Sequence, residues 1–473
     1  MVFNSLTFLV FFLLVVVLHH LAFSWKVKKF NLLVASYFFY GVWNPPFVLL
    51  LIISTLIDWF AGAGMGRSTT RAGKNFWLAV SLVGNLGMLS YFKYGEFLLQ
   101  NTVTVLSWVG IQYNPPPMDI ILPVGISFYT FQTLSYSIDI WRGKLEPSKS
   151  ILDFAFFVTF FPQLVAGPIV RASEFLPQCV EPFEANLNRF GWGLCLMTLG
   201  LFQKVVLADT LLAGTAEAVF DAKDGLAPLD AWLGVLAFSG QIFCDFAGYS
   251  TCAIGASLCL GFSLVNNFRF PFAACGFSDF WQRWHISLSR FLRDYVYISM
   301  GGNRCGAVRT CFNLMVTMLI GGLWHGASWT FVLWGFAHGL LLILERGLKA
   351  AFGHMAIWQK LPGRLFLTLL TYFCILLTWV LFRAQTFPNA GRMYSSLFGF
   401  VQEPIMVLAT LDMVKVAVVI TGLFLSHWFL KNTTIETIVS KAPSWLVVAL
   451  WVGMLFCVVL SQGGSDAFIY FQF

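Results

Sequence analysis

The sequence predicts an all-α polytopic membrane protein, and both its composition and the distribution of its apolar residues support this fold class. Of its 473 residues, 58% are hydrophobic and 11% are charged, whereas a soluble globular protein has roughly 25% charged residues. The apolar residues form long continuous runs, without the alternation of an outer-membrane β-barrel. Because only helices satisfy all their backbone hydrogen bonds internally in lipid, each run of about 20 apolar residues is a predicted spanning helix.

The first elements also predict an orientation. The run Leu6–Phe23 is followed by a basic cluster, Lys26–Lys29, and no cleavage site for a signal peptide precedes that cluster, so a retained first span is expected. The positive-inside rule places the Lys26–Lys29 loop and the later Arg67–Lys74 loop in the cytoplasm, and the N-terminus outside. Between them, Trp43–Pro46 is a helix-breaking turn without basic residues, which suits the outer face.

The remaining elements follow in order along the chain. A span is expected over Phe76–Phe92, and the apolar stretch Ile120–Ile140 is broken by Pro123 and Gly125 and contains many hydroxyl side chains. Exposure of that stretch to lipid would be costly, so it is expected to be buried against other helices or re-entrant. Further runs bring the total to about a dozen membrane segments: Phe30–Val42, Phe47–Phe60, Ile151–Val170, Trp192–Leu207, Ala231–Leu260, Cys311–Trp324, Trp329–Leu344, Leu365–Phe382, Val414–Leu430 and Trp445–Leu460.

One polar, basic segment, Ser263–Arg309, interrupts this pattern within what is otherwise predicted to be a single membrane-embedded domain over residues 1–473. Within it, Trp284, Leu288 and Phe291 recur at helical spacing, which predicts an amphipathic helix with a basic face. The arginines of that face are Arg283, Arg290 and Arg293. Such a helix commonly lies at the membrane interface against anionic lipid. Alternatively, its arginines bind the phosphates of a nucleotide-containing donor.

The basic residues and the cysteines exclude other classes of protein. The formal net charge is +7, but the lysines and arginines form short clusters between apolar runs, so no nucleic-acid partner is expected. The ten cysteines include no CxxC pair and no Cys/His spacing typical of zinc. The sequence therefore predicts neither structural disulfides nor a metal site.

Ionisable residues inside apolar runs are the candidates for chemistry, because they are costly at membrane depth. His325 lies in the glycine-rich run Gly321–Trp329, where it is either a general base or a histidine that hydrogen-bonds between helices as packing. His338 is expected to be structural. Asp245 is as consistent with a helix–helix hydrogen bond as with catalysis. The chain has no GxSxG, P-loop, HExxH or GxGxxG motif, so hydrolase-triad, NTPase and metalloprotease functions lose their usual support.

Several ordered motifs carry a resemblance to a known family: Pro162–Ile169, Gly200–Asp209, Phe243–Ser250, Asn266–Phe272, Phe280–Ser289, Leu292–Ile298, Gly301–Arg304, Gly322–Gly326 and Trp379–Ala384. Together they closely resemble the membrane-bound O-acyltransferase family. The resemblance is strongest to its bacterial branch for alginate O-acetylation, and relatives in bacterial cellulose acetylation indicate cellulose as an alternative acceptor. One departure is Thr251, where the alginate branch usually carries an acid after Gly-Tyr-Ser, and this puts alginate itself in doubt as the acceptor.

The resemblance implies a bundle of helices around a central chamber, which acetyl-CoA enters from the cytoplasm as donor substrate, with no permanently bound cofactor. The family's essential histidine falls on His325, as general base or transient acetyl acceptor, and its second histidine falls on His285, which would orient or polarise the acyl group. Asp245, Trp324 and Asn303 lie in the matching motifs and are expected as supporting residues.

The expected function is therefore a bacterial inner-membrane acetyltransferase that delivers acetyl groups toward an exported polysaccharide, directly or by relay. Expected partners are periplasmic acetyltransferases or carrier proteins, a polysaccharide synthase or export complex, and membrane lipids. Two other classes remain as alternatives. A transporter or flippase of lipid-linked sugars would show internal repeats with paired interrupted spans, which the sequence lacks. A non-catalytic membrane subunit of a synthase complex would need no buried histidine.

Overall fold

The structure is a computed structural model that describes residues 1–180 and 187–461. These residues fold into helices, and the β-type pairing recorded among them is an isolated bridge between Leu226 and Ile405. The all-α prediction is therefore confirmed. The chain divides into two compact units, residues 1–194 with 253–265, and residues 195–252 with 266–473.

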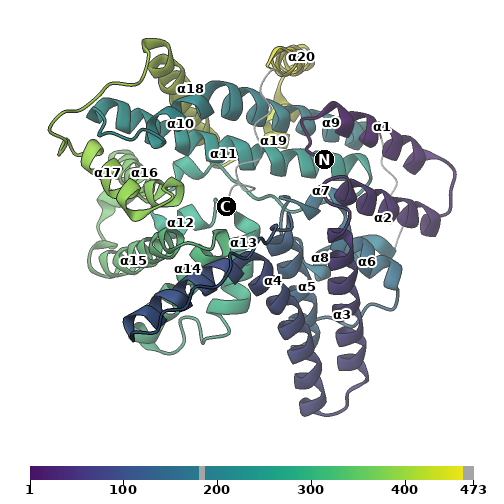
Figure 1. Ribbon diagram of the computed structural model, residues 1–473. Helices are drawn as coiled ribbons and strands as arrows, with labels where there is room; N and C mark the ends of the chain where they lie inside the picture. The colour runs from purple at the N-terminus through teal and green to yellow at the C-terminus, as the bar shows by residue number, and fades with distance from the viewer. Residues whose placement is uncertain (181–186, 462–473) are drawn as a thin grey trace. The chain divides into compact units, whose positions relative to one another are not determined.

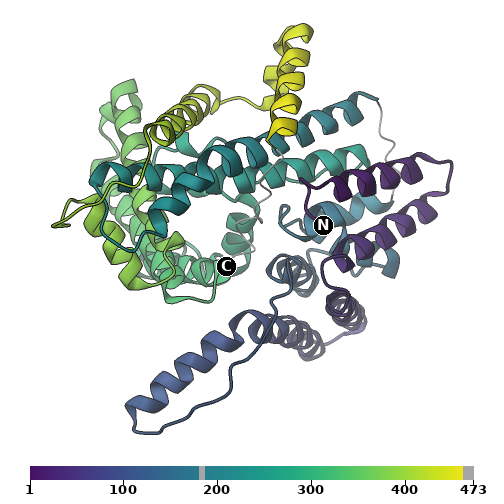
Figure 2. The ribbon, with the colours of Figure 1, turned by 45° about the horizontal axis from the view of Figure 1, so that its top comes forward.

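The first unit contains eight complete helices among its described residues: α1 (Leu6–His20), α2 (Trp25–Gly41), α3 (Phe47–Arg67), α4 (Arg71–Trp108), α5 (Ile126–Trp141), α6 (Ile151–Thr159), α7 (Phe161–Leu164) and α8 (Ala172–Val180). Helices α1 and α2, in purple, lie side by side, and α3 packs along α4 (Figures 1 and 2). Helices α9 (Leu187–Leu201) and α11 (Pro228–Cys259) contribute residues to both units.

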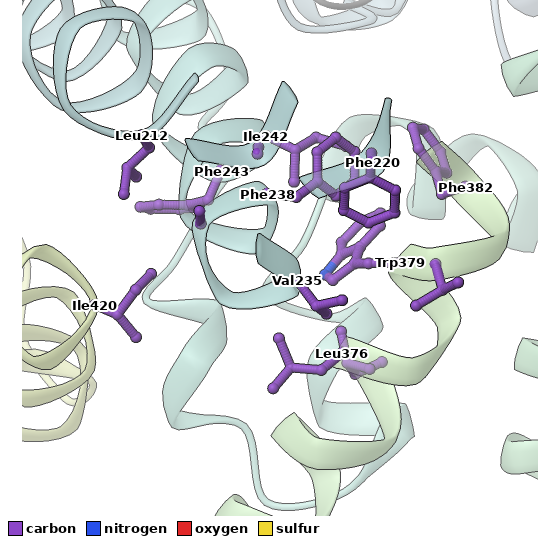
Figure 3. Packing of buried hydrophobic residues seen from close by; sticks show 14 of the residues in the cluster. Leu212, Phe220, Val235, Phe238, Ile242, Phe243, Leu376, Trp379, Phe382 and Ile420 are labelled. Carbon is purple, nitrogen blue, oxygen red and sulfur yellow. The ribbon is translucent and has the colours of Figure 1, made fainter. Parts of the chain in front are cut away.

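The second unit contains the remaining elements: the π-helix η1 (Phe202–Ala213), α10 (Gly214–Phe220), the 3₁₀ turn η2 (Pro271–Ala273), α12 (Phe277–Trp281), α13 (Ile286–Phe291), the π-helix η3 (Leu292–Tyr297), α14 (Gly306–His325), α15 (Trp329–Phe352), η4 (Ala356–Gln359), α16 (Leu361–Arg383), α17 (Phe387–Leu397), α18 (Thr410–Leu430), α19 (Ile435–Lys441) and α20 (Ser444–Leu460). A cluster of buried apolar side chains joins α10, α11, α16 and α18. Figure 3 shows the rings of Phe220, Phe238 and Trp379 turned toward one another within this core.

Seven stretches among the described residues are long and apolar enough to cross a membrane. They are α3, the continuous stretch Leu187–Phe220, α11, α14, α15, α16 and α18. Two further apolar helices, α1 and α20, are shorter. The expected total of about a dozen segments also counted these two helices and the stretches that lie in α2, α4, α5, α6 and α7, which are not among the seven.

Three predicted boundaries changed for identifiable reasons. The basic residues Lys26–Lys29 form the first turn of α2 instead of a loop, and Lys29 is buried in an ion pair with Asp153. Helix α4 extends well beyond the predicted end at Phe92, because the next helix-breaking prolines begin only at Pro115. The stretch from Ile151 splits into α6 and α7, and Pro162 lies in the first turn of α7, where a missing N–H costs nothing.

The predicted break near Pro123 and Gly125 is confirmed. Helix α5 begins at Ile126, directly after Gly125, whose backbone is left-handed with φ of 76°. Nearly all residues of α5 are buried, including its hydroxyl-bearing side chains. This explains why a stretch so rich in polar groups can lie among apolar helices, since its polar groups are kept from lipid.

The predicted continuous amphipathic helix through Trp284, Leu288 and Phe291 is wrong. Helix α12 ends at Trp281 and α13 begins only at Ile286. Between them His285 has a left-handed backbone with φ of 41°, a conformation that a non-glycine residue adopts at a cost of roughly 1–3 kcal/mol and that cannot continue a helix. The chain therefore turns at a histidine that the sequence had marked as a site residue.

Candidate active site

His325 is the last residue of α14, and close packing against α15 fixes its position. One turn earlier, Gly322 faces the backbone of α15, where a Cβ atom would clash with the carbonyl oxygen of Phe331. Gly335 makes the matching approach from α15 to the backbone of Met318. The glycines of this region thus allow two helix backbones to touch. The His325 side chain is buried.

Aromatic rings enclose the imidazole of His325. The ring centroids of Trp334, Trp324 and Phe382 lie 5.0, 5.1 and 5.2 Å from that of His325, all in edge-to-face arrangements. These rings come from α14, α15 and α16. They restrict the rotamers of the imidazole and limit the access of water to one side of it.

His285 lies at the start of α13 and is fully buried. Its Nδ1 atom is 3.3 Å from Oδ1 of Asn267, and its ring packs 4.6 Å from that of Phe246. Burial lowers the pKa of His285 to about 3, so its imidazole is neutral at pH 7. A neutral imidazole has one nitrogen that donates a hydrogen and one that accepts.

The structure brings the two predicted histidines together. The ring centroids of His285 and His325 are 6.3 Å apart, although the residues come from different helices. Trp324 lies beside both histidines, with its ring 5.5 Å from that of His285. The supporting role expected of Trp324 is therefore to pack against the two imidazoles. At this separation the edges of the two imidazoles are close to van der Waals contact, so both rings belong to one buried cluster.

A cavity of about 850 Å³ leads to His325. One face of α14 forms a wall of it, with Leu314, Thr317, Met318, Gly321 and His325 at helical spacing. At 1.5 Å per residue, this wall is about 16 Å long. The cavity is therefore a passage whose inner end is His325.

The exposed side of the cavity is basic. Five cationic side chains line it, with Glu345 as the acidic residue among the lining residues: Arg269, Arg290, Arg293, Arg346 and Lys349. Glu345 is occupied, because it pairs with Lys349 at 2.5 Å and accepts the backbone N–H of Ser278. Lys349 and Arg293 have more than half of their side chains exposed, at 61% and 58%. The cavity thus runs from an exposed cationic end to a buried histidine.

Sequence reasoning missed part of this basic end. Arg346 and Lys349 share a face of α15 with Leu342 and Glu345, and this periodicity was visible in the sequence. What the sequence did not show was that α15 folds back antiparallel to α14. The Gly322–Phe331 and Gly339–Met315 contacts set this alignment, which puts Arg346 near the start of α14 and far from His325.

The other predicted site residues take different places. Arg290 and Arg293 line the cavity, and so does Asn303, which accepts a hydrogen bond from the Tyr297 hydroxyl. Arg283 is instead buried and pairs with Asp279 at 2.8 Å.

Asp245 is buried away from the cavity, in an ion pair with Lys204 at 2.6 Å. Lys204 also pairs with Asp209 at 2.8 Å. One ammonium therefore bridges two carboxylates that come from η1 and α11, which ties these two helices together. Among the described residues, no group of three or more histidine, cysteine or acidic side chains is arranged to hold a metal ion.

Comparisons with known proteins identify the family. The model of the membrane-bound O-acyltransferase family matches residues 144–382, which contain both histidines and the whole cavity. The chain is 40% identical over 406 residues to a probable alginate O-acetylase AlgI of Pseudomonas aeruginosa, covering 85% of this chain and 75% of that protein. It is 36% identical over 398 residues to a peptidoglycan O-acetyltransferase of Helicobacter pylori, covering 78% and 74%.

A more distant similarity extends to a teichoic acid D-alanyltransferase of Streptococcus thermophilus, which is 30% identical over 265 residues, or 53% of this chain and 63% of that protein. The family match and the long, closely similar relatives agree with the helical fold and its apolar spans. The chain belongs to the membrane-bound O-acyltransferase family and is a multi-pass membrane protein with O-acyltransferase activity.

Proposed function

We propose that this protein transfers an acetyl group from cytoplasmic acetyl-CoA toward an exported polysaccharide. The observation that carries the proposal is the cavity, which joins cationic side chains to His325, a buried histidine that lies beside a second one, His285. A donor with phosphates at one end and a thioester at the other matches that distribution of charge.

The basic end suits the nucleotide part of the donor. Arginine binds phosphate through two parallel hydrogen bonds, and each such charge-assisted bond is stronger than a neutral one. Arg290 and Arg346 line the cavity and would make them, and Arg293 lines it while paired with Asp294 at 2.7 Å. The same end of α14 follows Arg304 and contains Arg309, and the positive-inside rule puts such a cluster in the cytoplasm. Donor entry from the cytoplasm is consistent with both arguments.

The chemistry is assigned to His325. As general base, His325 takes the proton of an acceptor hydroxyl while the hydroxyl oxygen attacks the thioester carbonyl. The carbon–sulfur bond then breaks, and the CoA sulfur leaves with a proton as the free thiol. In the alternative route, the imidazole of His325 first accepts the acetyl group itself and passes it to the hydroxyl. His285 orients the reacting groups in either route.

The acceptor is proposed from the relatives. Their names refer to alginate, peptidoglycan and teichoic acid. We place the protein in the bacterial inner membrane, with its N-terminus in the periplasm. There it acetylates a polysaccharide such as alginate or cellulose directly, or passes acetyl groups to a periplasmic transferase or carrier beside a synthase or export complex.

Purified protein incubated with radiolabelled acetyl-CoA tests the proposal. Oligosaccharides of alginate, of cellulose and of peptidoglycan are offered separately as acceptors, and free CoA is measured with a thiol reagent. We expect CoA release, faster with the correct acceptor, and label on that oligosaccharide or on an added periplasmic transferase. A transporter or a non-catalytic subunit would release no CoA, and that outcome with folded protein would overturn the proposal.

A further inference from the structure

Asn267 is a buried residue that holds the turn around His285 from outside the helix. Its backbone carbonyl accepts the N–H of Ile286 at 2.9 Å, and its side-chain Oδ1 accepts the N–H of Ser287 at 3.1 Å. The Ser287 hydroxyl also donates to Oδ1, at 2.8 Å. The first N–H groups of a helix have no partner within the helix. Asn267 supplies partners for two of them at the start of α13.

These contacts fix which way the Asn267 amide points. A backbone N–H can only donate, so the amide atom facing the Ser287 nitrogen must be the oxygen. The amide nitrogen then faces Ser250, and Nδ2 donates to the Ser250 hydroxyl at 3.1 Å. The Ser250 hydroxyl can accept as well as donate and is compatible with this orientation, so the Ser287 N–H is the contact that fixes it.

The orientation of the amide decides the tautomer of His285. The ring nitrogen Nδ1 lies 3.3 Å from the same Oδ1 atom, which can only accept a hydrogen. Nδ1 must therefore carry the proton. The buried, neutral ring has a single N–H, so Nε2 holds a lone pair.

We propose that Asn267 is a positioning residue that locks His285 in the Nδ1–H tautomer, so that Nε2 accepts a hydrogen bond at the reacting centre. His285 then cannot donate a hydrogen bond from Nε2 to the thioester carbonyl, and its role is to hold a group that donates, such as the acceptor hydroxyl. The inference rests on the proposed function of the histidine pair and narrows the role of His285 within it.

The tautomer is measured directly by NMR of protein labelled with ¹³C and ¹⁵N in histidine. The His285 signals are assigned by their absence in His285→Gln. We expect the shifts of an Nδ1–H imidazole in the wild type and in Asn267→Asp, which keeps an oxygen acceptor. In Asn267→Leu, which has similar volume and no acceptor, we expect a mixture of tautomers. An Nε2–H signal in the wild type, or an unchanged spectrum in Asn267→Leu, would overturn the inference.

Kinetics separate positioning from a merely structural role. Asn267→Leu should lower kcat by about ten- to a hundredfold, the range for a lost buried hydrogen bond, with the donor KM unchanged. Asn267→Asp should recover most of that loss, and the acid limb of its pH–rate profile should move to higher pH, because a carboxylate favours the imidazolium form. A loss shared equally by both variants, or a pH profile identical in Asn267→Asp, would contradict the positioning role.

Ser250→Ala is the matched control. It removes the partner of Nδ2 and leaves every contact of Oδ1 in place, so the tautomer and kcat should stay near the wild type. A Ser250→Ala variant with the same losses as Asn267→Leu would show that general loosening is responsible. A failure of the proposed function is distinguishable from a failure of this inference. If His285→Gln transfers acetyl at the wild-type rate, His285 takes no part in the reaction, whereas the NMR spectrum of the wild type still reports the tautomer of His285.

Discussion

His285 combines several unusual features at a single residue. It is fully buried, its backbone is left-handed, and it lies 6.3 Å from the second histidine of the site. A non-glycine residue in this conformation costs roughly 1–3 kcal/mol, a cost that proteins retain mainly at functional sites. Contacts from Asn267, eighteen residues earlier, hold it there. The local sequence around His285 predicted a helix because these contacts come from outside it.

The buried state of His285 predicts a dependence of stability on pH. Its pKa is about 6.5 when exposed in the unfolded chain and about 3 in the folded protein, so the unfolded state binds a proton that the folded state excludes. The folded state therefore loses stability as pH falls from 6.5 toward 3, by up to about 1.4 kcal/mol per pH unit. Thermal unfolding of the wild type and of His285→Gln, followed from pH 7 to pH 5, measures this contribution. We expect the stability of His285→Gln to rise relative to that of the wild type as pH falls. A difference in stability that stays constant with pH would contradict the lowered pKa of His285.

At the scale of the helix, α14 has two adjacent glycines with different surroundings. Gly322 packs against the backbone of α15, whereas a Cβ atom at Gly321 would meet only the flexible end of Leu292. Gly321 also lines the cavity one turn before His325. Gly322 brings two helices together, and Gly321 leaves space where the acyl group would lie.

Enlarging Gly321 should therefore change the choice of acyl donor. We expect Gly321→Val to fold and to lower the rate with propionyl-CoA and butyryl-CoA more than the rate with acetyl-CoA, by about tenfold or more for each added methylene. Competition assays with the three donors measure this ratio. Gly347→Ala, on an open part of α15, is the control with unchanged selectivity, and Gly322→Ala should instead lower stability. If the relative rates with the three donors are the same in Gly321→Val as in the wild type, the acyl group does not lie beside Gly321.

The basic end of the cavity gives a second prediction at this scale. Neutralising Arg293 or Arg346 should weaken acetyl-CoA binding by about ten- to a hundredfold if the side chain contacts a phosphate, and added salt should reduce the difference. Arg283→Gln is the comparison, because Arg283 pairs with Asp279 and does not line the cavity. We expect it to lower the unfolding temperature and to leave donor affinity near the wild type. Equal affinities of all variants for acetyl-CoA in calorimetric titration would rule out contacts between these arginines and the donor phosphates.

The helices differ in how far the sequence determines them. The break before α5 was predictable because Pro123 and Gly125 act locally on the backbone. The spans were predictable because apolar length is a local property. The turn at His285, the pairing of Arg283 and the position of Arg346 depend on partners distant in sequence. The sequence therefore predicted His285 and His325 as site residues. The structure brings their rings together and places His325 at a cavity whose basic lining was predicted only in part.

The whole molecule has an orientation that the charge clusters predict. Residues near Lys26 and in the turn between α3 and α4 should face the cytoplasm. After replacement of the native cysteines, single cysteines at Lys26 and Thr69, both exposed positions, test this prediction. They should resist a membrane-impermeant thiol reagent in intact cells and react after permeabilisation. A cysteine at Trp43, in the predicted outer turn, serves as the positive control. Ready labelling at Lys26 in intact cells would reverse the orientation and the side of donor entry.

The central claim is that His325 performs chemistry on a donor that reaches it through the cavity. The most direct test compares purified wild type, His325→Ala and His325→Gln for acetyl transfer from labelled acetyl-CoA, with thermal unfolding measured on the same preparations. Glutamine can keep a packing hydrogen bond but cannot take a proton at neutral pH. We expect both variants to fold normally and to lose about 10²–10⁴ in rate. A folded His325→Gln variant that transfers acetyl at the wild-type rate would contradict the claim and leave His325 as a packing residue.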